Sequence, residues 1–434
     1  MKITSYLRDT FSLDIRSLAV FRIGLGLVIL YDLLLLWPDA DAFFGPKGVY
    51  PAFLFNHDPH SITHWSFHAL SNASFFICGL FYLNGILAVL LILGIATKPI
   101  TCLCWLMAIS LAHRNPMVMY LGRDYALILF LMWGMFLPLG SAFSIDALIK
   151  KTHAPAMRVF SLASVGLISS LMMIYLLCGW FKIHPSWNHD LSALNYVFNN
   201  SDFATPLGVW LLQYPLLLKI LTWLTVFIER FGILLLLLPL PNSIVRSFLI
   251  IVFCVFHLSL FGTMIVEWFA FIMIAAWLAL IPPSWWNGTL KYPPVDINKN
   301  PWIDCLAGAA LLFVIACNYN NAREFFFHTP RSALFKAAQI AGLDFPWRLF
   351  SPSPPLIRSQ YHLVPIFEGR PIVDLNDYQL RKKTSYRWKF LLRHENNMLM
   401  PYLKKYLIDY WNKKYPHNPR VIDVRIYFTQ EKIL

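Results

Sequence analysis

The stretch VFSLASVGLISSLMMIYLLCGWF, from Val159 to Phe181, decides the fold: it runs for 23 residues without a charge and ends at Lys182. About 20 apolar residues in a helix are enough to cross a bilayer. The stretch therefore predicts a membrane-spanning helix with a lysine at its mouth. Position alone fits two roles for Lys182. It is either an anchor that snorkels to the headgroups or an amine kept for proton transfer, since a lysine shielded from water loses its proton more readily.

Composition extends the membrane prediction to most of the chain. The 434 residues are 58% hydrophobic and only 14% charged, and they hold several other uncharged runs of similar length. The first of these, residues 18–37, contains Arg22 and Asp32 and lacks a small-residue cleavage pattern, so we expect it to be retained. All seven cysteines lie in apolar segments, which predicts neither a disulfide framework nor a zinc site.

Nine apolar segments are candidate spans: 18–37, 75–97, 99–113, 121–140, 159–181, 215–238, 245–263, 266–281 and 302–317. Loops on the N-terminal side of these spans hold ten basic residues and loops on the other side five, which predicts a cytoplasmic N-terminus. Nine spans then place the C-terminal part outside, and one span more or fewer reverses that prediction. We therefore predict an all-α polytopic membrane helical bundle over residues 1–317, followed by a small basic α+β domain over residues 318–434.

The C-terminal part is polar and basic, with 19 Lys and Arg against 9 Asp and Glu in residues 318–434. No nucleic-acid-binding motif accompanies this charge, so membrane lipid or an acidic peptide is the expected partner. Tyr361 to Phe367 and Pro371 to Leu375 predict two strands joined by a turn. Met398 to Trp411 has helical spacing, and Arg420 to Phe428 alternates as a half-buried strand does.

Several polar residues interrupt the apolar segments and are candidates for chemistry. Glu229-Arg230 lies near the middle of segment 215–238, where an ionised pair is costly unless it faces the bundle interior. His257 lies near the centre of its own segment, where a hydrogen-bonded core histidine is the alternative to a functional one. Together with Lys182 and His184 these residues suit proton transfer at a lipid-soluble cofactor. No phosphate-binding glycine loop or dinucleotide motif is present, so we expect no soluble nucleotide cofactor.

Two further clusters lie between the early spans. Arg114 and Asp124 are predicted to pair across a short hairpin, either at a functional site or as an ordinary ion pair in an outer loop. His60, His64 and His68 have the spacing of one helical face. Apart from Asp58 no carboxylate or cysteine lies among these histidines, so we expect no metal site there.

The order and spacing of several motifs resemble the vitamin K-dependent gamma-carboxylase family and its bacterial relatives, the HTTM (horizontally transferred transmembrane) proteins. The resemblance covers roughly residues 15–285, with one more element beyond them. The motifs are Phe21-Arg22-Ile23-Gly24-Leu25-Gly26 with Asp32, Arg114-Asn115 with Gly122-Arg123-Asp124, Ser144-Ile145-Asp146-Ala147, Gly179-Trp180-Phe181-Lys182 with Trp187, Phe256-His257, and Trp347-Arg348-Leu349-Phe350-Ser351-Pro352.

The resemblance implies a quinol-linked enzyme of the bacterial inner membrane. In the carboxylase, the lysine that Lys182 matches deprotonates reduced vitamin K. Oxygen then turns the quinol into a strong base, which removes a proton from a glutamyl side chain before carbon dioxide adds. By this resemblance the catalytic candidates are Lys182, His184 and Asn115, and a peptide or protein is the expected substrate. The residues expected around a reduced, vitamin K-like quinone are Arg114, Asp124, Glu229 and His257.

One departure from the family pattern bears on the second half of that reaction. The carboxylase has a histidine soon after its Asn-containing loop, whereas Pro116 follows Asn115 here. His113 or His184 would have to replace it, so the quinol chemistry is expected more firmly than carboxylation. Two alternatives stay open: a non-catalytic membrane scaffold, and a maturation factor for a secreted peptide.

Overall fold

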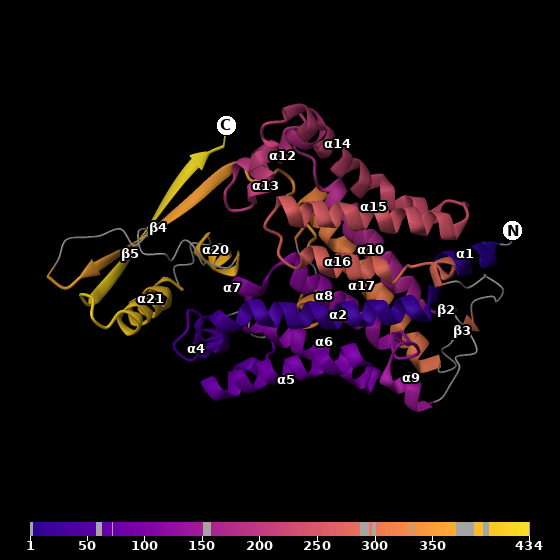
Figure 1. Ribbon diagram of the computed structural model, residues 1–434, viewed down its shortest axis with the longest axis horizontal. Helices are drawn as coiled ribbons and strands as arrows, with labels where there is room; N and C mark the ends of the chain where they lie inside the picture. The colour runs from indigo at the N-terminus through magenta and orange to yellow at the C-terminus, as the bar shows by residue number, and fades with distance from the viewer. Residues whose placement is uncertain are drawn as a thin grey trace.

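Long apolar helices that lie side by side form the body of the molecule in the computed structural model (Figure 1). The structure describes residues 3–57, 63–71, 73–150, 158–286, 295–296, 301–330, 333–369, 386–393 and 399–433. The bundle helices are α2 (Ile15–Leu36), α5 (Ser74–Leu93), α6 (Thr97–Arg114), α8 (Gly122–Phe136), α10 (Leu162–Trp180), α14 (Pro215–Phe231), α15 (Asn242–Thr263), α16 (Phe269–Leu278) and α17 (Pro301–Phe327). A helix thus occupies each of the predicted spans.

Length and hydropathy separate these helices into two groups. Within the described residues, six helical segments are long and apolar enough to cross a membrane. They are Ile15–Phe44, Ser74–Leu93, Leu162–Trp180, Pro215–Leu237, Asn242–Thr263 and Pro301–Phe327. The helices α6, α8 and α16 are less apolar or shorter, so the total of nine crossings stays a prediction. The N-terminus and the C-terminal strands lie at opposite ends of the bundle (Figure 1).

Short elements cap the two ends of the bundle. Near the N-terminus, β1 (Leu13–Asp14) pairs antiparallel with β2 (Arg158–Phe160), which pairs parallel with β3 (Val295–Asp296). The remaining short helices are α1 (Ile3–Phe11), α3 (Ala40–Phe44), α4 (Ala52–His57), α7 (Pro116–Met119), α9 (Ile145–Lys150), α11 (Pro185–Asn188), α12 (Ala193–Asn199), α13 (Pro206–Leu211) and α18 (Leu334–Ile340). Within the described residues, the 3₁₀ segments are η1 (Trp37–Asp39), η3 (Phe67–Ala69), η4 (Gly232–Leu237) and η5 (Pro283–Trp286).

The helix α10, which carries the stretch that decides the fold, begins later than the uncharged run. The first two residues of the uncharged run, Val159 and Phe160, belong to β2. Ser161 then caps the helix and forms a reciprocal capping box with Ser164. The helix then passes through the centre of the bundle. Gly166 lies against the indole ring of Trp133 on α8, and that indole donates to Ser170 Oγ over 2.8 Å. Close helix packing through a small residue is typical of membrane bundles.

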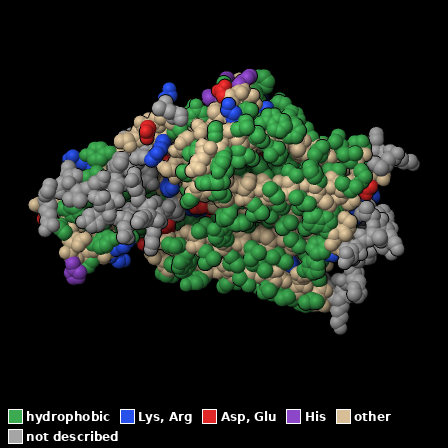
Figure 2. Space-filling model, turned by 45° about the horizontal axis from the view of Figure 1, so that its top comes forward, with side chains coloured by type: hydrophobic (Ala, Val, Ile, Leu, Met, Phe, Trp, Pro, Cys, Tyr) green, Lys and Arg blue, Asp and Glu red, His purple; other side chains and the backbone are tan. Residues whose placement is uncertain are grey.

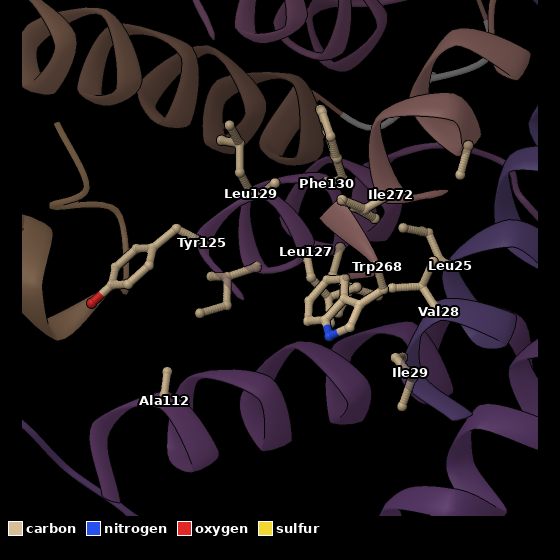
Figure 3. Packing of buried hydrophobic residues seen from close by; sticks show 14 of the residues in the cluster. Leu25, Val28, Ile29, Ala112, Tyr125, Leu127, Leu129, Phe130, Trp268 and Ile272 are labelled. Atoms are coloured by element: carbon tan, nitrogen blue, oxygen red, sulfur yellow. The ribbon is translucent and has the colours of Figure 1, made fainter. Parts of the chain in front are cut away.

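The core of the bundle is built from large apolar side chains of α2, α6, α8 and α16. Figure 3 shows Leu25 and Ile29 of α2 beside Trp268 and Ile272, with Phe130 of α8 nearby. On the outside, α14 exposes a stripe of Leu216, Ile220, Trp223 and Phe227. Figure 2 shows hydrophobic side chains over most of the face that covers the bundle, with few charges among them. A surface of this composition and extent fits contact with lipid.

The C-terminal elements form a strand pair with one packed helix. β4 (Ile357–Phe367) pairs antiparallel with β5 (Val421–Lys432), and α21 (Met400–Lys414) packs on β5 through Leu403, Leu407 and Trp411. The first predicted strand, the helix and the last strand are confirmed, while predicted strand 371–375 lies outside the described residues. A further helix, α20 (Tyr386–Arg393), lies between this unit and the bundle (Figure 1). Because α17 continues past residue 317 to Phe327, the division at 317 stays a prediction.

We predict that Gly166→Ala destabilises the protein, because a Cβ atom there would overlap the Trp133 ring. Overpacking of this kind costs about 1–3 kcal/mol. Gly79→Ala is the matched control, since a Cβ at Gly79 in α5 meets nothing within 4 Å. Thermal unfolding in detergent, followed by tryptophan fluorescence, should give a lower Tm for Gly166→Ala alone. Equal Tm values for the two variants would contradict the packing described.

Candidate functional site

A buried ion pair between Lys182 and Glu229 joins the end of α10 to α14. Lys182 is 2% exposed, and its Nζ donates to Glu229 Oε2 over 2.6 Å and to the carbonyl oxygen of Cys178 over 3.1 Å. The ammonium also lies 5.2 Å from the ring centre of Trp187. Lys182 follows the last turn of α10, so its side chain reaches back to a carbonyl that the helix leaves free. This position excludes the snorkelling role, because the amine points into the protein.

The neighbouring residue Arg230 fixes the turn that carries Lys182. Its Nε donates to the carbonyl of Gly179 and its Nη2 to the carbonyl of Lys182, both over 2.8 Å. Glu229 therefore pairs with Lys182, while Arg230 binds backbone oxygens at the end of α10. The adjacent charges of Glu229 and Arg230 therefore both connect α14 to the end of α10.

A cavity of about 160 Å³ lies next to this ion pair. Its walls are mainly apolar and include Ile174 of α10, Val266, Met273 of α16 and Leu349. A dry apolar cavity of about 150 Å³ is large enough for benzene, so this one has the scale of an aromatic ring. The ionisable side chains on its wall are those of Lys182, Glu229, His257, Arg123, Tyr175, Tyr386 and Cys178.

His257 reaches the cavity from α15 at the end of a hydrogen-bonded chain. Trp277 Nε1 donates to the hydroxyl of Tyr175 over 2.9 Å, and that hydroxyl lies 2.5 Å from His257 Nε2. An indole N–H only donates, so the Tyr175 oxygen accepts from Trp277. The same hydroxyl can then donate to His257 Nε2, which places the imidazole proton on Nδ1, or accept from it, which leaves Nδ1 as an acceptor. In the described part of the chain, His257 Nδ1 is buried and has no partner. His257 therefore brings an unpaired polar nitrogen to the residues that line the cavity.

The predicted pair between Arg114 and Asp124 is wrong. Arg114 instead donates to the carbonyls of Tyr50 and Phe44, over 2.9 and 3.1 Å, and so holds the chain around α3. Its neighbour Asn115 does the same for Phe43, through Nδ2 over 2.8 Å. Backbone oxygens outside regular structure need such donors when they are buried. Arg114, Asn115 and Asp124 are not among the residues that line the 160 Å³ cavity.

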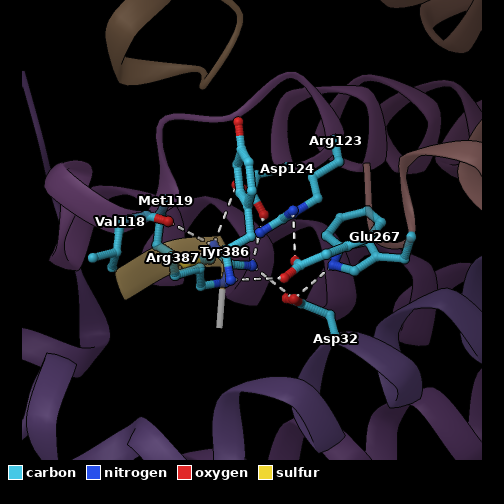
Figure 4. A network of polar contacts seen from close by, with 9 residues as sticks. Asp32, Val118, Met119, Arg123, Asp124, Glu267, Tyr386 and Arg387 are labelled. Atoms are coloured by element: carbon cyan, nitrogen blue, oxygen red, sulfur yellow. Dashed lines mark hydrogen bonds and ion pairs between the residues drawn. The ribbon is translucent and has the colours of Figure 1, made fainter. Parts of the chain in front are cut away.

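Asp124 pairs with a residue that the sequence reasoning missed, Arg387 of α20 (Figure 4). Arg387 Nη2 lies 3.1 Å from Asp124 Oδ1 and 2.7 Å from Asp32 Oδ1, and Trp268 also donates to Asp32. Burial alone would lower the pKa of Arg387, but the carboxylates of Asp124 and Asp32 raise it above its ordinary value. No local pattern separates Arg387 from the other basic residues of the C-terminal part.

The remaining candidate histidines lie elsewhere. His184 is half-buried and caps α11, with Nδ1 2.9 Å from Ser186 Oγ, and it does not line the cavity. His64 is in an irregular segment and His68 in η3, so the predicted shared helical face is wrong, and His60 lies outside the described residues. Burial, reinforced by Arg114, lowers the pKa of His68 to about 3. Among the described residues there is no group of three His, Cys, Asp or Glu side chains that could hold a metal.

Comparison with known proteins places the bundle in a family. The family model described as HTTM domain matches residues 11–285, which include Lys182, Glu229 and His257. The match ends before α17 and the C-terminal elements. No curated protein and no solved structure matches the chain.

We predict that Arg387→Ala strongly destabilises the protein, because it leaves the carboxylates of Asp32 and Asp124 buried without their cation. Removal of one partner from a buried ion pair costs about 3–5 kcal/mol. The control is Arg425→Ala, which removes an exposed arginine from β5. Unfolding in mixed detergent, measured by tryptophan fluorescence, should separate the two variants. If the free energy of unfolding of Arg387→Ala were close to that of Arg425→Ala, the ion pairs of Arg387 with Asp32 and Asp124 would not hold α20 on the bundle.

Proposed function

The chain belongs to the HTTM domain family, and from this premise we propose that it is an integral membrane enzyme in which Lys182 and Glu229 remove a proton from a lipid-soluble quinol. The observation that carries the proposal is the buried ion pair at the wall of an apolar, ring-sized cavity. A buried lysine without a functional partner is rare inside a membrane bundle, and here both members of the pair border the same space.

The pair has a means of producing a basic amine. In a site with few water molecules, the proton of the ammonium can pass to the bonded carboxylate, which leaves a neutral amine and a neutral acid. A neutral amine in contact with the cavity then accepts a proton from an acidic hydroxyl placed beside it. Arg230 keeps Lys182 in position meanwhile, because it binds the carbonyl of Lys182 itself.

The other walls fit an aromatic ring that bears oxygens. Apolar side chains surround most of the space, and the unpaired His257 Nδ1 can hydrogen-bond a ring hydroxyl in either tautomer. The outer faces of α14 and α15 carry exposed apolar side chains such as Phe227 and Leu258, so lipid is one helix away from the cavity. A bound quinol would supply the acidic hydroxyl and the redox chemistry.

The proposal does not extend to carboxylation. Asn115 is held by the carbonyl of Phe43, and Pro116 stands where the resemblance expects a histidine nearby. A peptide or protein substrate, the bacterial inner membrane and an extracytoplasmic C-terminal domain remain proposals based on the resemblance and on loop charges. The competing function is a non-catalytic scaffold, in which Lys182 and Glu229 serve only to join α10 to α14.

The double variant Lys182→Met/Glu229→Gln tests the proposal, because it removes both charges and leaves neither one buried alone. We expect the variant to fold like the wild type but to lose oxygen uptake with reduced 2-methyl-1,4-naphthoquinone. General base catalysis contributes about 100-fold or more, so the protein-dependent rate should fall by at least that factor. Lys219→Met, on the exposed face of α14, is the matched control and should keep the rate.

Two results would contradict the proposal. One is an unchanged rate in a well-folded Lys182→Met/Glu229→Gln variant. The other is a wild-type protein that neither binds the quinone nor increases oxygen uptake above the spontaneous reaction. In both cases the scaffold function would be the better account of the same contacts.

A further inference from the structure

Arg123 forms a second polar position on the wall of the same cavity. It lies in the first turn of α8, its side chain is 3% exposed, and its Nη1 is 2.6 Å from Glu267 Oε2. The guanidinium lies near two aromatic rings, with its Cζ 5.6 Å from the ring centres of both Trp268 and Tyr386. Figure 4 shows Arg123 beside Tyr386 and Glu267. Two aromatic contacts and one ion pair therefore restrict the orientation of the guanidinium.

Two of its nitrogens have no acceptor. Nε and Nη2 of Arg123 are buried, and within the described residues neither donates a hydrogen bond. These two atoms form one edge of the guanidinium, so their hydrogens point in nearly the same direction, as a fork does. Burial of unpaired donors costs free energy, which is recovered when an oxygen atom is supplied. His257 also lines the cavity, and its Nδ1 is likewise buried without a partner among the described residues.

The surrounding charges indicate which kind of oxygen fits. Glu267, Asp32 and Asp124 supply three carboxylates to this cluster, and Arg123 and Arg387 supply two guanidinium groups. A ligand carboxylate would add to the excess of negative charge in a buried place, which is unfavourable. An uncharged carbonyl or hydroxyl oxygen accepts from the same fork without that cost.

We propose that Arg123 binds an uncharged oxygen of the ring-shaped ligand through Nε and Nη2, as a binding position separate from the Lys182–Glu229 pair. This inference rests on the proposed function, since it assigns a second contact to the same ligand. A flat ring with oxygens at two positions, as in 1,4-naphthoquinone, offers one oxygen to Arg123 and one to the Lys182–Glu229 pair, which line the same cavity. The rings beside Arg123 come partly from α20, so the C-terminal elements complete the binding site.

Tyr386 is the aromatic neighbour of Arg123 that comes from α20. Its backbone N–H donates to Glu267 Oε1 over 3.2 Å, so the residue is tied to the partner of Arg123. It also lines the cavity, and its ring lies tilted against that of Phe203, with the ring centres 6.4 Å apart. Because Nε and Nη2 of Arg123 are buried, a ligand reaches them only after a local rearrangement, in which we expect the neighbouring Tyr386 ring to move. The site is therefore expected to bind slowly and to release slowly, since local rearrangement precedes contact.

Infrared spectroscopy of purified full-length protein with 1,4-naphthoquinone, labelled with carbon-13 at both carbonyls, tests the inference. The free quinone is symmetric, so it gives one carbonyl environment. We expect two in the wild type, one of them shifted to lower frequency by the guanidinium hydrogen bonds. Arg123→Gln should remove the shifted band and raise Kd about tenfold, the usual effect of one strong hydrogen bond. Arg425→Gln is the control and should change neither.

A second variant keeps the test decisive if Arg123→Gln fails to fold. Arg123→Gln leaves Glu267 without its cation, whereas Arg123→Gln/Glu267→Gln removes both charges and should show the same loss of the band and of affinity. An unchanged spectrum and Kd in a folded variant would overturn the inference. So would binding of 2-naphthoate to the wild type as tightly as the quinone, because that result would assign the fork to an anion.

The outcome can be separated from that of the proposed function. Lys182→Met/Glu229→Gln should still bind 1,4-naphthoquinone with the shifted band, because Arg123 is untouched. If the wild type binds the quinone but Arg123→Gln changes nothing, only the Arg123 position fails. If the wild type binds no quinone, the proposed function and this inference fail together.

Discussion

The requirement that every charge inside an apolar bundle finds a partner governs this structure. An isolated ion in such surroundings costs several kcal/mol, so side chains from distant segments must meet. Lys182 meets Glu229 and so joins α10 to α14. Arg387 meets Asp32 and Asp124 and so joins α20 to α2 and α8. These contacts determine which helices are neighbours where apolar packing alone would allow several arrangements.

The same requirement shapes the cavity. The ion pair of Lys182 with Glu229 stands on its wall, and so does Arg123, whose partner Glu267 lies behind it. Charged groups that must stay paired and oriented keep aromatic rings such as those of Trp187 and Trp268 beside them. Apolar side chains elsewhere on the wall exclude water and so strengthen both pairs. The result is a ring-sized cavity that Arg123, Lys182 and Glu229 line at separate positions.

The C-terminal elements belong to this arrangement although the family match ends at residue 285. Tyr386 lines the cavity, and its neighbour Arg387 is fully enclosed between carboxylates of the bundle. The strand pair β4–β5 and α21 stand away from the bundle in Figure 1, so α20 is the element that connects them to it. Events at the C-terminal unit can therefore reach the cavity through two adjacent residues.

The sequence by itself determined the helices and drew attention to Lys182, Glu229 and His257. A long apolar run is a helix in a membrane whatever its neighbours are, and a charge within such a run is conspicuous because burial is costly. Only the tertiary structure decided the partners. Lys182 and Glu229 are 47 residues apart, and Asp124 and Arg387 are 263 apart. Arg114 and Asp124, which are close in the sequence, do not pair, because Arg114 is needed by the carbonyls of Tyr50 and Phe44. Pairing follows distance in space, and that distance is fixed by how all the helices pack together.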